Sequence, residues 1–205
     1  MRENENLVID FGNLSEHQLW TTSEGRIDIL LSVANSFLEK IPSELLPDGK
    51  NRVLFEVVTN GFLFFIVGAR DELLQKINRN LGGIIPSEND VTLYNLKQAL
   101  IKNKENENFV KIHELLNNCT QEPYKRSNYV GDFERSKSWL WELNNLRVRI
   151  THDGILFLKS ESSTIDQFLT LCVTNDIEEK NPYQYFKSCY EKFLELKKSM
   201  EEKLS

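Results

Sequence analysis

Apolar residues recur three and four positions apart through most of the chain, and this spacing predicts long amphipathic helices. Residues 24–40 form the first such helix, with Ser23 as its expected N-cap. Residues 51–81 form the longest, and its middle, GFLFFIVGA, is apolar on every side, which is typical of the buried centre of a bundle. A strand is the alternative for this stretch, because Phe, Val and Ile also favour sheets. The sequences on either side of it favour a helix.

Further helices are predicted downstream. A short one runs from a cap at Asn89 or Asp90 to Lys102, and others cover 109–119 and 133–150. The last begins at Asn181-Pro182, an N-cap followed by Pro at the first helical position. Residues 155–176 fit either a short strand with a Ser-rich turn or another helix. The expected fold is all-α, a bundle of about five main helices, with a short strand or hairpin after residue 154 as the alternative.

The chain of 205 residues suits a single domain, taken as 24–205, behind a polar segment at 1–23. Its formal charge of −6 is carried by residues 1–48, where nine acidic residues face three basic ones. The bulk charge therefore does not indicate general nucleic-acid binding. Residues 125–149 hold six basic and three acidic residues, a small excess that also fits a solvated helix face.

The three cysteines are far apart and show no metal-binding spacing, which fits a reducing compartment. The N-terminal sequence MRENENLVID lacks the apolar run of a signal peptide. The longest stretch without a charge, residues 57–69, has thirteen residues, too few by itself to span a bilayer. We expect a cytoplasmic protein that does not use a membrane, a metal or a cofactor.

One segment carries candidate chemistry, the sequence WLWELNNLRVRITHDG at 139–154. Trp139, Leu143, Leu146 and Ile150 form an apolar stripe, and Gly154 is the expected stop of the helix. Arg147 and His152 are separated by four residues. That spacing, at the end of an amphipathic helix and followed by Asp-Gly, resembles the Arg-x(4–6)-His motif of the HEPN superfamily. The resemblance covers this motif closely and the rest of the chain only as an all-helical layout.

The resemblance implies metal-independent cleavage of RNA by a homodimer whose two motifs face each other. It makes Arg147 and His152 the catalytic pair. It also implies a toxin or antiviral defence effector, with an antitoxin protein as a further partner. Val148 departs from the family pattern, in which the residue after the Arg is usually polar and often Asn. Asn144 or Asn145 is the candidate substitute for that amide.

These residue types suit the reaction on chemical grounds. A histidine with a pKa of roughly 6.5 transfers protons near neutral pH, and an arginine holds two phosphate oxygens while keeping its charge. On an ideal helix, however, Arg147 and His152 lie about 140° apart, whereas Asn145, Arg149 and His152 share one stripe. Three readings stay open: the helix loosens before His152, the pair works across a dimer, or Arg149 is the nearer partner.

Other residues have both a functional and a structural reading. Asp71, just after the apolar core helix, could point into the same cleft, although a salt bridge with Arg70, Lys76 or another base is the simpler role. Trp139 is expected in the core, and Trp141 could stack on a base. His17 and His113 are expected at the surface. The first hypothesis is thus a ribonuclease. The alternatives are a HEPN-like module that binds nucleotide or protein without catalysis, and a structural helical protein with a chance motif.

Overall fold

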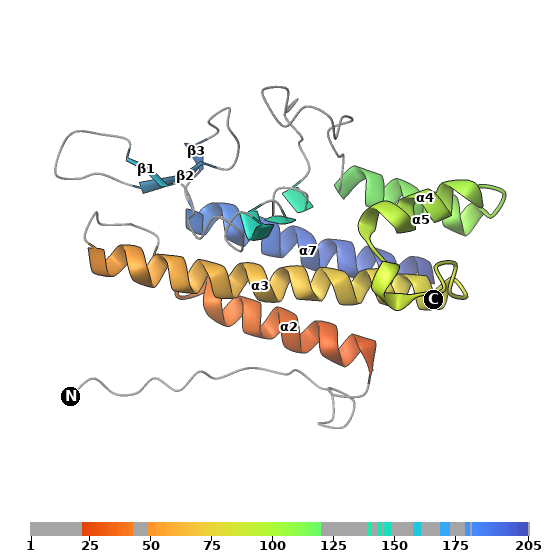
Figure 1. Ribbon diagram of the computed structural model, residues 1–205, viewed down its shortest axis with the longest axis horizontal. Coiled ribbons are helices and arrows are strands. Elements are labelled where there is room, and N and C mark those ends of the chain that lie inside the picture. Colours follow the sequence, from red (N-terminus) through yellow and green to blue (C-terminus); the bar gives the residue numbers. More distant parts are fainter. Residues whose placement is uncertain are drawn as a thin grey trace.

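The structure, a computed structural model, describes residues 22–42, 49–119, 139–140, 143–144, 146–148, 158–160, 169–172, 179–180 and 182–204. This part of the chain is mostly helical, which confirms the all-α prediction (Figure 1). Its helices are α2 (Ser23–Leu38), α3 (Gly49–Asn80), the 3-10 helix η1 (Glu88–Asp90), α4 (Leu93–Lys102), α5 (Glu107–Cys119) and α7 (Pro182–Leu204). The described residues between Trp139 and Val148 are helical too, and we call them the Arg147 segment.

Threonines cap two of these helices. Thr22 lies one position before the expected cap Ser23, and Thr92 lies two or three positions after the expected Asp90 or Asn89. The hydroxyl of Thr22 accepts a hydrogen bond from the Gly25 amide at 3.0 Å, and that of Thr92 accepts one from the Asn95 amide at 3.1 Å. Each satisfies an amide of the first turn that has no partner within its helix. Ser23 belongs to the helix itself, so the prediction of Ser23 as a cap is wrong, as is that of Asn89 or Asp90 for α4.

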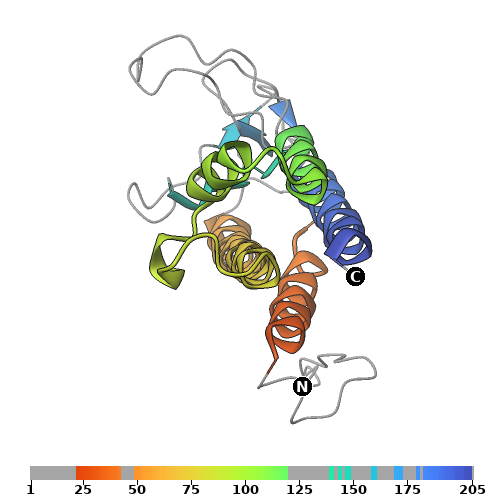
Figure 2. The same ribbon diagram turned by 90° about the vertical axis from the view of Figure 1, so that its right-hand side faces the viewer.

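Helix α3 is the central element and packs against both α2 and α7. The end-on view in Figure 2 shows it between α2 and the pair α4 and α5. Its helical state settles the choice between helix and strand for the apolar stretch. Close approach of α2 depends on Gly61, since a Cβ built there would lie 2.5 Å from the Phe37 ring. The core around α3 also includes five buried side chains of α7: Phe186, Cys189, Phe193, Leu196 and Met200.

The end of α3 is shaped by two glycines and a buried asparagine. Gly82 and Gly83 have φ values of 81° and 72°, the left-handed region that favours glycine at a helix end. Beyond them the chain is held by Asn78, which is 3% exposed. Its Nδ2 donates to the Ile85 carbonyl at 2.9 Å, and its Oδ1 accepts from the Ile85 amide at 2.9 Å. This pair of hydrogen bonds fixes the path of the chain toward η1.

The first half of α3 is not covered on every side, contrary to the expectation of an all-round buried helix. Val53, Leu54, Val57 and Phe64 are 62%, 50%, 59% and 59% exposed. Phe55, Val58 and Phe62 on the opposite side are at most 3% exposed. The apolar composition of this helix therefore reflects a core face and a second, open apolar face.

Short strands occur within and just after residues 155–176, for which the sequence fitted either a strand or a helix. β1 (Leu158–Ser160) pairs antiparallel with β2 (Leu169–Cys172), which pairs antiparallel with β3 (Glu179–Lys180). The helical reading is therefore wrong for residues 169–172, and the strand alternative holds there.

Residues Val53–Asn80 of α3 are long and apolar enough to cross a membrane by length and composition. Less than half of the most apolar window, 44%, is buried inside the protein. The same criteria are met by core helices of soluble proteins, and a single such helix is weak support for a membrane span.

Candidate functional site

The Arg147 segment is anchored in the core by its apolar stripe. Trp139, Leu143 and Leu146 are 8%, 0% and 1% exposed, as the spacing predicts. The Trp139 ring meets that of Phe193 edge-on, with centroids 6.4 Å apart. These side chains fix one side of the helix against the bundle, and Arg147, one turn after Leu143, is held at the edge of that side, where 36% of its side chain is exposed.

Arg147 faces the open side of α3. Its guanidinium carbon lies 5.8 Å from the centroid of the Phe64 ring, and its Nη1 lies 3.7 Å from Asp71 Oδ2. Phe64 and Asp71 are seven residues apart, about two turns, and so share one stripe of α3. An aromatic face and a carboxylate together favour one position of the guanidinium.

Asp71 is bound more closely by its neighbour Arg70. Arg70 Nε and Nη2 donate to Asp71 Oδ1 at 3.0 and 2.7 Å, and Arg70 Nη1 donates to Asn144 Oδ1 at 2.8 Å. The salt bridge expected between Asp71 and Arg70 is therefore present. It links α3 to the Arg147 segment, since Asn144 stands one turn before Arg147.

Among the described residues, the cluster carries a net positive charge. Two guanidinium groups share one carboxylate, and the shorter contact of Asp71 is with Arg70, whose side chain is only 14% exposed. At 3.7 Å, the contact with Arg147 is longer than a direct charge-assisted hydrogen bond. Asp71 is therefore paired more closely with Arg70 than with Arg147.

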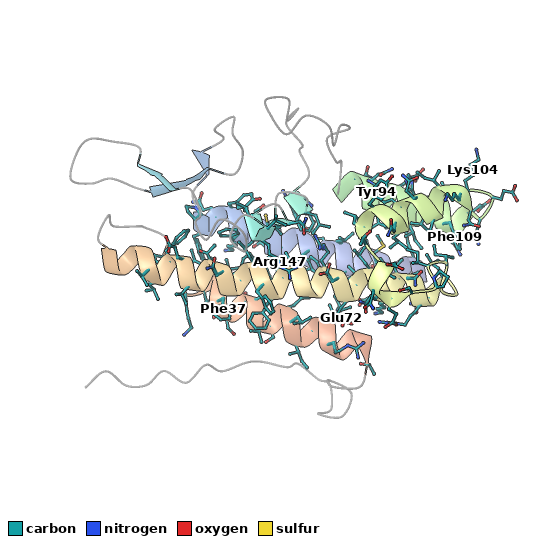
Figure 3. All side chains as sticks on the ribbon, viewed as in Figure 1. Phe37, Glu72, Tyr94, Lys104, Phe109 and Arg147 are labelled. Atoms are coloured by element: carbon teal, nitrogen blue, oxygen red, sulfur yellow. The ribbon has the colours of Figure 1, made fainter. Side chains whose placement is uncertain are left out.

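An open pocket of about 710 Å³ begins on the other side of Asp71. Its walls come from α3, η1, the first turn of α4 and the Arg147 segment. The lining residues are Arg70, Asp71, Gln75, Glu88, Asn89, Val91, Thr92, Leu93, Tyr94, Asn95, Leu140 and Asn144. Figure 3 shows Tyr94 near the start of α4 and Arg147 over the middle of α3. Arg70, Asp71 and Asn144 thus belong to both the arginine cluster and the pocket wall.

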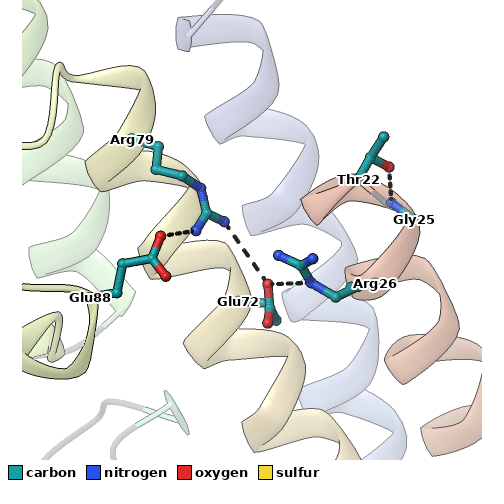
Figure 4. Close-up of polar contacts among 6 residues, drawn as sticks. All are labelled: Thr22, Gly25, Arg26, Glu72, Arg79 and Glu88. Carbon is teal, nitrogen blue, oxygen red and sulfur yellow. Dashed lines mark hydrogen bonds and ion pairs between the residues drawn. The ribbon is translucent and has the colours of Figure 1, made fainter. Parts of the chain in front are cut away.

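Ion pairs fix η1 against α3 on this side of the molecule (Figure 4). Arg79 Nη1 contacts Glu88 Oε1 at 2.7 Å, and its Nη2 lies 4.0 Å from Glu72 Oε2. Glu72 Oε2 also accepts from Arg26 Nε of α2 at 3.1 Å. Single exposed pairs contribute little to stability. Their role here is to position Glu88, which together they hold beside the pocket.

The structure brings three predicted site residues together: Arg147, Asn144 and Asp71. His152, Arg149 and Asn145 lie outside the described residues, as do Trp141 and His17. Phe64 and Tyr94 were not predicted. Phe64 could have been found from its seven-residue spacing to Asp71, whereas Tyr94 reaches the pocket only through the packing of α4.

His113 was expected at the surface, but it is half-buried on α5. Both of its ring nitrogens lie 3.3 Å from Asn117 Nδ2. Burial, and then the charge of Lys97, lower the pKa of His113. Within the described ranges, no three His, Cys, Asp or Glu side chains are grouped so that they could hold a metal ion.

No family model matches the chain, and no curated protein or solved structure is detectably similar to it.

Proposed function

We propose that the protein is a metal-independent endoribonuclease of the HEPN type, acting in the cytoplasm as a toxin or antiviral defence effector. The observation that carries the proposal is the position of Arg147. Its guanidinium is at the surface, between exposed Phe64 and Asp71, on a segment anchored by buried Leu143 and Leu146. A segment anchored by buried side chains and a partly exposed guanidinium are two features that a phosphate-binding arginine needs.

The proposed reaction uses the RNA's own 2′-hydroxyl. Its oxygen bonds to the adjacent phosphorus, the bond from phosphorus to the 5′-oxygen breaks, and a 2′,3′-cyclic phosphate remains. Arg147 binds the phosphate oxygens as negative charge builds on them. Protonated His152 gives a proton to the departing 5′-oxygen, and a second, neutral base takes the proton of the 2′-hydroxyl. No cofactor enters these steps.

Asp71 is the positioning residue in this scheme. It lies between Arg70 and Arg147, so it limits how far the Arg147 guanidinium can rotate from the surface. Arg149 stays the second choice for the partner of His152. Asn144 and Asn145 stay the candidate amides beside the phosphate. Asn144 Oδ1 accepts from Arg70, which orients its Nδ2 as a donor.

A homodimer is part of the proposal, and the open face of α3 supports it. We define this face by Val53, Leu54, Val57 and Phe64. Val148, which follows Arg147 in the sequence, is another exposed apolar residue, with 44% exposure. A two-fold axis through this region would bring two copies of Arg147 to one cleft and cover the apolar side chains. Val148 would then contribute apolar contact area to the dimer interface. An antitoxin protein could restrain the enzyme by covering the same face.

The second candidate is a HEPN-like module that binds nucleotide or protein and has lost catalysis. The polar pocket beside Asp71 favours it, because such a pocket can bind a ligand without any reaction at Arg147. Val148, at a position that is usually polar in the family, favours it too.

Expression in cells separates the two candidates. Wild-type protein should arrest growth and fragment RNA, and His152→Ala should do neither while accumulating as a folded protein. His113→Gln is the matched control, a histidine on α5 with no role in the scheme, and it should act like wild type. A folded His152→Ala variant with undiminished RNA cleavage would overturn the proposal. Intact RNA with wild-type protein, together with measurable nucleotide binding, would favour the binding module.

A further inference from the structure

The pocket beside Asp71 has the size of a small-molecule site and a mainly polar lining. Its volume of about 710 Å³ lies within the roughly 300–1,000 Å³ typical of ligand pockets. Its apolar lining includes Leu140 and Val91, which are 2% and 8% exposed. Amide, hydroxyl and carboxylate groups make up most of the remaining wall. A lining that combines buried apolar side chains with polar groups suits a flat, partly polar ring.

An aromatic ring stands at the pocket wall. Tyr94, in the first turn of α4, is 54% exposed, although a tyrosine usually buries its ring. Its helix is fixed by the Thr92 cap and by the hydrogen bond from Asn95 Nδ2 to the Asp90 carbonyl at 2.8 Å. A rigid, accessible aromatic ring is the usual platform on which a base of single-stranded nucleic acid stacks.

The charges of the pocket favour a base over a phosphate. Asp71 and Glu88 line it, and both are carboxylates that repel anions. Arg70 also lines it, but its Nε and both terminal nitrogens already donate to Asp71 and Asn144. Arg147 is absent from the pocket lining and lies on the far side of Asp71. The phosphate and the base therefore have separate places, divided by one carboxylate.

We propose that this pocket binds a nucleobase of the RNA next to the phosphate held by Arg147, with Tyr94 as the stacking surface. The inference rests on the proposed ribonuclease function and adds a subsite to it. The carboxylates accept hydrogen bonds, and so does Asn95 Oδ1, because Asn95 Nδ2 is engaged with Asp90. Adenine, cytosine and guanine carry an exocyclic amino group that donates to such acceptors, whereas the N3–H donor of uracil is flanked by two carbonyl oxygens, which these acceptors repel. The pocket therefore selects the three amino-bearing bases over uracil.

The test measures binding of 2′-O-methyl hexanucleotides of A, C, G or U, which cannot be cut through the 2′-hydroxyl. Fluorescence anisotropy with the full-length chain should show weaker binding of the U oligomer than of the other three. Tyr94→Ala should weaken binding of the preferred oligomers roughly ten-fold or more, because this is the loss of affinity expected when one base loses its stacking partner. Tyr94→Phe keeps the ring and should bind like wild type. Ile101→Ala removes an exposed apolar side chain of the same helix outside the pocket, and should also bind like wild type.

Two results would overturn the subsite: equal affinity of wild type and Tyr94→Ala for every oligomer, or no binding of any oligomer by wild type. The proposed function fails separately. If binding depends on Tyr94 but wild type leaves ordinary RNA intact, the subsite stands and the ribonuclease does not. If RNA is cut in a His152-dependent way and Tyr94→Ala changes neither affinity nor KM, the ribonuclease stands and the subsite does not.

Discussion

The two halves of α3 are built from similar apolar residues but have different surroundings. After Gly68, Leu73, Leu74 and Ile77 are at most 2% exposed, and the outward positions are polar. Before Gly68, the inward side chains are equally buried, but the exposed positions include the apolar residues Val53, Leu54, Val57 and Phe64 beside Asn60. A large apolar side chain left in water forgoes the roughly 1.5–3 kcal/mol that full burial contributes. The first half therefore has two apolar faces, and the second half has one.

The boundary between the halves coincides with the candidate site. Phe64 is the last exposed apolar residue of α3, and Asp71 is the next polar residue on the same stripe. Arg147 contacts both. The arginine thus marks the line where an apolar surface meets the polar pocket.

The largest expected effect separates the two faces of the first half. Phe62→Ala should lower the free energy of unfolding by about 3–5 kcal/mol, because Phe62 is fully buried against Phe186, with ring centroids 5.1 Å apart. Phe64→Ala, two residues further on, should change it by only about 0.5 kcal/mol. Urea unfolding at low protein concentration measures both. Equal losses would mean that the open face is covered within one chain.

Self-association tests what covers that face. Phe64→Asp should weaken dimerisation by about 2 kcal/mol or more, as a charge at the centre of an apolar interface does. Leu194→Asp, at an apolar residue of α7 that is 42% exposed, is the matched control and should dimerise like wild type. Sedimentation equilibrium gives the dissociation constants. A wild-type protein that is monomeric at micromolar concentration while cutting RNA would contradict the two-chain site.

The polar end of α3 should depend on Asn78. Asn78→Ala removes both hydrogen bonds to Ile85 and should cost about 2 kcal/mol or more, since buried backbone groups lose their partners. Asn60→Ala, at an exposed asparagine of the first half, should be close to neutral. Thermal unfolding compares the two. If Asn78→Ala were as stable as Asn60→Ala, the hydrogen bonds to Ile85 would not be what holds this turn.

A smaller effect on stability is expected at the two glycines through which α3 contacts α2, Gly61 and Gly68. Gly61→Ala should destabilise by about 1–3 kcal/mol, because its Cβ would lie 2.5 Å from the Phe37 ring, which is itself stacked on Phe65. Gly68→Ala places its Cβ 3.7 Å from Leu30, an ordinary contact, and should stabilise by about 0.5–1 kcal/mol. Denaturant midpoints of the two variants should therefore move in opposite directions. Movement in the same direction would contradict the close approach at Gly61.

Much of the fold could be predicted because the three- and four-residue spacing of apolar side chains in a helix is visible in a single sequence. The stripe of Trp139, Leu143 and Leu146 was predicted as core and is buried. The caps were missed because Ser, Thr, Asn and Asp all cap helices, and the choice among neighbours depends on local geometry. The open face of α3 was missed for another reason. A helix that is apolar on every side gives no contrast from which to decide which side the bundle covers.

The candidate site was predicted in part, because sequence spacing identifies some of its residues and tertiary packing decides the others. Arg147, Asn144 and Asp71 carry charge or amides within or beside recognisable helices, so spacing alone could single them out. Phe64 and Tyr94 look like core residues in the sequence. Their exposure depends on how α3 and α4 meet the Arg147 segment, which is a property of tertiary packing.

Cleavage of RNA by purified protein in the presence of EDTA tests the central claim most directly, with Arg147→Ala and Lys111→Ala as the paired variants. Lys111 is an exposed base on α5, 53% exposed and loosely paired with Glu107, outside the pocket. Wild type and Lys111→Ala should cut RNA to products ending in 2′,3′-cyclic phosphate and leave DNA and 2′-O-methyl RNA intact. Arg147→Ala should be on the order of 100-fold slower or more. Cleavage that disappears with EDTA, or that a folded Arg147→Ala variant performs at the wild-type rate, would contradict the claim.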